Sequence, residues 1–147
     1  LQKAEKTHVP CMALMLKDST IITAKTSKLL SAAAALFLNA VKHLANINDA
    51  IPLISPNLIE PIQNLKTHIN PANESMMDLN ETLISLAIQA PMNALSELAL
   101  TQIDKLKGAQ AHSSVLLDKQ DLQILKQIGI DVTEESVPAS NKLYWRS

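Results

Sequence analysis

The segment that most constrains this chain is residues 20–44, where a short β-branched run leads through a turn into a long apolar-periodic stretch. Residues 20–23 favour a strand, because β-branched side chains pack well on a pleated surface. Residues 29–44 carry apolar side chains at helical spacing and predict an amphipathic helix, with Thr26 or Ser27 as its N-cap. A strand joined this closely to a helix favours an α/β fold.

Composition limits the chain to a particular kind of core. Its 147 residues suffice for one domain. The only aromatic residues are Phe37, Tyr144 and Trp145, so the core must be built from Leu, Ile, Ala and Met. With Gly108 and Gly129 as the only glycines, a loop-rich β-sandwich or a glycine-cradled phosphate site is disfavoured. The 13 basic and 14 acidic residues are well mixed, so a nucleic-acid partner is not expected.

Cysteine usage and hydropathy suggest a compartment. Cys11 is the only cysteine, which excludes an internal disulfide and a thiolate metal cluster. No apolar run approaches the roughly 20 residues of a membrane span, so no membrane partner is expected. These features predict a cytoplasmic protein. The chain begins without Met, which we interpret as an excised domain or a processed or truncated chain.

The predicted architecture is a helix-rich α/β fold with a small sheet. Residues 9–16 and 20–23 form an N-terminal strand pair, a run of helices follows, and a strand–helix–strand unit ends the fold. In that unit, strands 112–117 and 130–133 are expected to be parallel with a right-handed crossover. We assign a single domain to residues 9–133, a frayed end to 1–8 and a tail to 134–147, in which Tyr144 and Trp145 could dock on a neighbour.

Capping signals define the middle helices. Ser55 followed by Pro56 predicts a helix start, although Pro61 leaves two alternatives: the helix begins at Pro61 with Glu60 capping it, or it bends there. Asp78 with a glutamate three residues later is a capping arrangement for a helix that runs to residue 90. A further helix is expected over residues 93–107.

The residues Lys25, Thr26 and Ser27 form one candidate site. Free N–H groups at a helix N-terminus, two hydroxyls and an ammonium are suited to binding an anion. They resemble the end of a Walker A motif, but Ser19 and Ala24 stand where that motif needs glycines, so a nucleotide loop is disfavoured. The alternatives are a looser phosphate or carboxylate site and a plain helix cap.

His112 is the candidate catalytic residue. It is expected to open its strand, where it shares a face with Ser114 but not with Ser113, because neighbours on a strand point to opposite faces. A hydrogen-bonded structural histidine and an acid/base role are the two alternatives. The other histidines show no metal-ligand spacing, so neither a metal nor a cofactor is expected.

Short motifs in a fixed order give the chain a family resemblance. It resembles the C-terminal region of the uncharacterised bacterial domain-of-unknown-function family eighteen forty-six, over about residues 9–133. That family's pattern has Gly where this chain has Ala24, and Cys where it has Ala109 or Gln110. The resemblance implies a longer protein with a P-loop-like segment in its earlier part and brings no established reaction. The motifs are ITAKTS at 22–27, LNA at 38–40, LISP at 53–56, IEPIQ at 59–63, LKG at 106–108, AHSS at 111–114 and IGI at 128–130.

Two functional hypotheses follow. The first is an accessory, oligomerisation or regulatory domain of a larger protein, whose partners are a second copy or the missing N-terminal region. The alternative is an enzyme domain that binds an anionic small molecule at Lys25, Thr26 and Ser27, with His112 as acid/base. If His112 opens its strand, it can join that site only when the strand runs antiparallel to residues 20–23.

Overall fold

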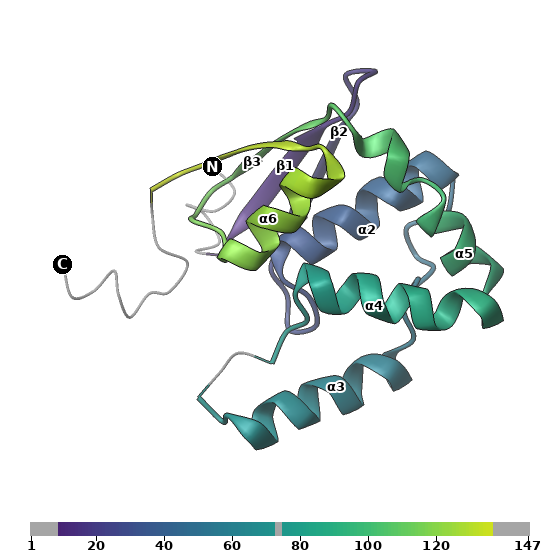
Figure 1. Ribbon diagram of the computed structural model, residues 1–147, viewed down its shortest axis with the longest axis vertical. Coiled ribbons are helices and arrows are strands. Elements are labelled where there is room, and N and C mark those ends of the chain that lie inside the picture. Colours follow the sequence, from purple (N-terminus) through teal and green to yellow (C-terminus); the bar gives the residue numbers. More distant parts are fainter. Residues whose placement is uncertain (1–8, 73–74, 137–147) are drawn as a thin grey trace.

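A four-stranded mixed sheet forms one side of the fold, and helices cover it from the other (Figure 1). The computed structural model describes residues 9–72 and 75–136. The strand order is β2-β1-β3-β4; β1 is antiparallel to both neighbours, and β3 and β4 are parallel. The strands are β1 (Cys11–Met15), β2 (Ile21–Lys25), β3 (Gln110–Ser113) and β4 (Asp131–Glu134).

The helices fill the chain between β2 and β3 and the crossover between β3 and β4. Their arrangement confirms the predicted fold class, with a strand pair at the start and a parallel strand–helix–strand unit at the end. They are α2 (Ala32–Ala45), α3 (Pro56–Ile69), α4 (Leu79–Gln89), α5 (Ala94–Leu100) and α6 (Lys119–Ile128), with the short 3₁₀ turns η1 (Ala90–Met92) and η2 (Ile103–Leu106).

Strand alternation gives the sheet two different faces. Met12, Leu14 and Ala24 are buried and belong to the apolar core under the helices. Because successive side chains alternate, the residues between them point to the opposite face, which we call the outer sheet face. Ala13 pairs with Thr23 on one side and His112 on the other, so these three residues form one row on that face.

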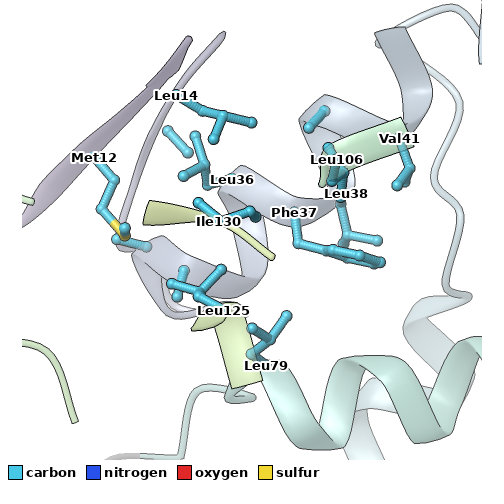
Figure 2. Close-up of a cluster of buried hydrophobic side chains, with 14 of the residues drawn as sticks. Met12, Leu14, Leu36, Phe37, Leu38, Val41, Leu79, Leu106, Leu125 and Ile130 are labelled. Atoms are coloured by element: carbon cyan, nitrogen blue, oxygen red, sulfur yellow. The ribbon is translucent and has the colours of Figure 1, made fainter. Parts of the chain in front are cut away.

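The core lies between the sheet and α2. Figure 2 shows Leu36 and Phe37 of α2 close to side chains from the sheet, from α4 and from α6. Ala33 and Ala40 of α2 are also fully buried, and their small size lets neighbouring elements approach closely. The predicted helix at residues 29–44 is therefore the central packed helix.

The start of α2 differs from the expectation that Thr26 or Ser27 caps it. The cap is Ser31, whose side chain accepts a hydrogen bond from the Ala34 amide. Leu29 and Leu30 lie before the helix because their backbone pairs with Met77: the Met77 amide donates to the Leu29 carbonyl, and Leu30 and Met77 form a parallel bridge. This tertiary pairing outweighs the local helical spacing of the two leucines.

Helix α3 begins at Pro56 with Ser55 as its cap, so the start predicted from Ser55 and Pro56 is confirmed and the alternative start at Pro61 is wrong. Pro61 lies inside the helix, in its second turn. Of the residues of α3, only Ile59 is buried. In Figure 1, α3 lies on the far side of α4 from the sheet.

Two predicted elements have different bounds. The helix expected over 93–107 breaks into α5 and η2, because the Thr101 hydroxyl donates to the Leu98 carbonyl at 2.6 Å and tightens the last turn of α5. The strand expected over 112–117 is β3, which begins at Gln110. It ends at Ser113, whose hydroxyl bonds locally to the Val115 backbone and turns the chain away.

Leu36→Ala should lower the free energy of unfolding by about 2–5 kcal/mol, because it leaves a cavity in the core. Leu36 is 1% exposed, whereas Leu65 on α3 is 59% exposed and provides a matched leucine control. Urea unfolding of both variants measures the effect. A loss below about 0.5 kcal/mol for Leu36→Ala, the range of surface changes, would contradict the central position of α2.

Candidate functional site

The hydroxyls of the predicted anion site bind the chain's own backbone. Thr26 Oγ1 accepts a hydrogen bond from the Ala32 amide at 3.2 Å. Ser27 Oγ accepts from the amides of Leu29 and Leu30 at 3.3 and 3.2 Å. These bonds shape the loop that leads into α2. Lys25, the third residue of the predicted site, is exposed at the end of β2.

A carboxylate from the same chain lies at the N-terminus of α2. Asp121, in the first turn of α6, accepts a hydrogen bond at Oδ2 from the Ser31 hydroxyl, over 3.3 Å. Its other oxygen, Oδ1, accepts from the Leu79 amide at 3.0 Å, which is the first amide of α4. A negative charge is stabilised at a helix N-terminus, and Asp121 lies at two such termini, those of α2 and α4.

Asp121 is buried, at 4% exposure, and burial raises its pKa above the ordinary carboxyl value. The nearby carboxylates of Asp78 and Asp118 raise this pKa further, while the hydrogen bonds from Leu79 and Ser31 lower it. The group is therefore a buried acid held by hydrogen bonds. Its position indicates a structural anchor that joins α2, α4 and α6.

Sequence reasoning did not find Asp121, although a signal was present. Leu125 lies one helical turn after Asp121 and Ile128 continues the same stripe, so the aspartate interrupts the apolar face of α6. An acidic residue at such a position must be paired or neutral when the helix packs. The partners, Ser31 and Leu79, are 90 and 42 residues away in sequence.

His112 is held on the outer sheet face by two neighbours. Its Nδ1 lies 2.7 Å from the Thr133 hydroxyl oxygen on β4. Its Nε2 lies 2.9 Å from Glu135 Oε2, an ion-pair distance if the ring is protonated, but the approach is not that of a directed hydrogen bond. Both ring nitrogens therefore face groups of the domain itself, Thr133 and Glu135, and these contacts link β3 to β4 and to the residue that follows it.

The expectation that His112 opens its strand is wrong. It is the third of four residues in β3, because pairing with β4 starts at Gln110. Since β2 and β3 both run antiparallel to β1, they are parallel to each other, and His112 lies toward the same edge of the sheet as Lys25. Strand β1 separates them, and with strands about 4.8 Å apart the two residues lie roughly 10 Å or more apart.

The outer sheet face carries a shallow depression of about 560 Å³. Ala13, Met15 and Ile21 contribute its apolar side, and His112 and Thr133 contribute polar groups.

Within the described residues, no group of three or more His, Cys, Asp or Glu side chains is placed to hold a metal ion. None of the described helices is both long and apolar enough to span a bilayer.

Large apolar side chains are also exposed on α3, α4 and η1. We call this set the α3–α4 surface. Leu65 and Ile69 are one turn apart on α3, and Ile84 and Ile88 are one turn apart on α4; Met92 of η1 is the fifth member. The two helices run in opposite directions (Figure 1) and are joined by an ion pair from Lys66 Nζ to Glu81 Oε1, over 2.9 Å.

Fold and surfaces together define a helix-rich α/β domain whose sheet is covered on one face. The chain belongs to the family described as Domain of unknown function DUF1846, C-terminal, which matches residues 1–144. This confirms the resemblance seen in the sequence motifs.

Relatives of known sequence carry the same domain as part of a longer chain. A UPF0371 protein of Streptococcus equi subsp. equi (strain 4047) is 41% identical over 143 residues, which are 97% of this chain and 29% of that protein. A UPF0371 protein of Clostridioides difficile (strain 630) is 43% identical over 136 residues, which are 92% of this chain and 27% of that protein. The chain thus spans less than a third of these relatives, as their C-terminal part.

Asp121→Asn should change how stability depends on pH. The folded-state pKa of Asp121 is raised above its ordinary value of 3.8. The contribution of this group to the free energy of unfolding is therefore largest below pH 3.8, and it decreases as the pH rises through the raised pKa. The amide does not titrate. The stability of the variant relative to wild type should therefore increase with pH across this weakly acidic window, as measured by urea unfolding at a series of pH values.

Asp121→Ala gives the complementary result. It removes the acceptor for the buried Leu79 amide and should cost about 1–3 kcal/mol at any pH where the wild type is folded. A stability difference between Asp121→Asn and wild type that stays constant with pH would contradict the raised pKa. A neutral Asp121→Ala would contradict the anchoring role.

Proposed function

We propose that this chain is an accessory domain that assembles copies of a longer cytoplasmic protein through its α3–α4 surface. The observation that carries the proposal is the exposure of all five apolar side chains of that surface, each more than half exposed. Soluble domains rarely leave such side chains grouped on neighbouring elements, and larger apolar patches mark interaction sites. The cytoplasmic setting is supported by a single, unpaired, buried cysteine, Cys11.

The energetics are compatible with a second copy as the occupant. Complete burial of an aliphatic side chain is worth about 1.5–3 kcal/mol, so a half-exposed one contributes about 1 kcal/mol. Five side chains on one copy then give about 5 kcal/mol, and both copies in a two-fold interface give about 10 kcal/mol. Association costs about 4–15 kcal/mol, and the gain from the paired surfaces lies within that range, so a dimer formed through them should be weak.

Contacts at the predicted anion site do not support the enzyme alternative. The Thr26 and Ser27 hydroxyls accept bonds from backbone amides of the loop and of α2. His112 faces Thr133 and Glu135. Since β1 lies between Lys25 and His112, the two residues are not neighbours in the sheet.

Self-association should be visible by sedimentation velocity with the isolated chain at about 10–100 µM, the range expected of a weak interface. Ile84→Glu should shift the chain to monomer, because it places a charge in the apolar contact. Ile21→Glu is the matched control: Ile21 is 57% exposed and Ile84 is 52% exposed, but Ile21 lies on the outer sheet face.

Circular dichroism melting confirms that each variant remains folded. A wild-type chain that is monomeric across the whole concentration range would contradict the proposal. So would equal weakening of association by Ile84→Glu and Ile21→Glu, because the contact would then not be specific to the α3–α4 surface.

A further inference from the structure

The outer sheet face is uncovered by the described helices. Core residues from α2, α4 and α6 form one cluster with the inner-face residues Met12 and Leu14. On the opposite face, Met15 is 39% exposed and Ile21 is 57% exposed. Moreover, β3 and β4 are a parallel pair, and parallel strands in α/β proteins are covered on both faces.

Where the depression lies, this face has an apolar and a polar half. On the β2–β1 side, Ile21 pairs with Met15, and Ala13 follows in the next row. On the β3–β4 side, His112 lies beside Thr133, and Asp131 is exposed one row away. The depression extends across both halves. A matching surface would offer apolar side chains toward β1 and hydrogen-bond donors or a cation toward β4.

We propose that the region preceding this domain in the longer protein docks on the outer sheet face. More than two-thirds of the length of the relatives lies outside the matched part, and the family is a C-terminal domain, so most of the protein comes before it. The entering chain reaches the domain at Cys11, the first residue of β1, which is a central strand. The described chain thus enters at an end of the sheet, whereas α3 lies on the far side of α4 from the sheet (Figure 1).

This docking goes beyond the self-association proposed above and does not depend on it. The two surfaces use different elements, the strands in one case and α3, α4 and η1 in the other. Docking joins two parts of one chain, so its occupancy is independent of protein concentration. Self-association joins two chains, so its occupancy rises with concentration.

Two methionines of the domain report on the two surfaces. Met15 lies on the outer sheet face, and Met92, which is 81% exposed, lies on the α3–α4 surface. Peroxide converts exposed methionine to the sulfoxide, and peptide mass spectrometry gives the rate at each residue. The rates are compared between the isolated 147-residue chain and the full-length protein, both at low concentration.

Docking predicts that Met15 is oxidised about tenfold more slowly in the full-length protein than in the isolated chain, because local opening must precede reaction. Met92 should react at a similar rate in both at low concentration. Ile21→Glu in the full-length protein should restore the faster oxidation of Met15. Ile84→Glu, the matched isoleucine change on α4, should leave Met15 protected.

Equal Met15 rates in the two proteins would overturn the docking proposal. Protection of Met15 that appears only at high concentration would overturn it too, because the cover would then be another chain. Protection of Met92 that rises with concentration reports self-association separately, so failure of one proposal is distinguishable from failure of the other.

Discussion

The fold depends on the buried carboxylate of Asp121, which joins three helices at one point. Its two oxygens accept hydrogen bonds from the Ser31 hydroxyl at the start of α2 and from the Leu79 amide at the start of α4. A buried charge without partners would cost several kcal/mol; here hydrogen bonds and two helix dipoles offset part of that cost, although burial still raises the pKa of Asp121. Since α6 provides the aspartate, the C-terminal crossover unit is fastened to the helices that precede it.

The segments that lead into α2 and α4 are also held to each other. The Ser31 amide donates to the Met77 carbonyl, and the Met77 amide donates to the Leu29 carbonyl. Met77 is fully buried, although its neighbourhood in sequence has the character of a linker. The feature that in sequence suggests an external anion site is thus satisfied within the fold: the loop hydroxyls bind backbone amides, and the anion is a side chain of the domain.

A sheet that helices cover on one face only and a loosely packed helix, α3, are features that suit a domain of a larger protein. Helix α3 is attached through Ile59, through the Lys66–Glu81 ion pair and through a hydrogen bond from the Gln63 side-chain amide (Nε2) to the Lys28 carbonyl. Leu58 and Ile62 are partly buried against the core, but Leu65 and Ile69 remain exposed, as do Met15 and Ile21 on the sheet. The core around Leu36 and Phe37 accounts for the integrity of the domain, while these outer surfaces remain for contacts beyond it.

The sequence by itself determined the features whose causes are local. Helical spacing identified α2, the Ser55-Pro56 pair marked the start of α3, and Asp78 with Glu81 formed the expected capping box of α4. The hairpin and the parallel strand–helix–strand unit followed from short connections. The family resemblance likewise came from short motifs in a fixed order.

Only the tertiary structure decided the features that depend on distant partners. The start of α2 moved to Ser31 because Leu30 pairs with Met77, and β3 began at Gln110 because β4 lies beside it. The role of Asp121 was hidden because its partners are far away in the chain. Local propensity and periodicity involve energies of about 1 kcal/mol per residue or less. Hydrogen bonds between distant segments override them when burial leaves the alternative unsatisfied.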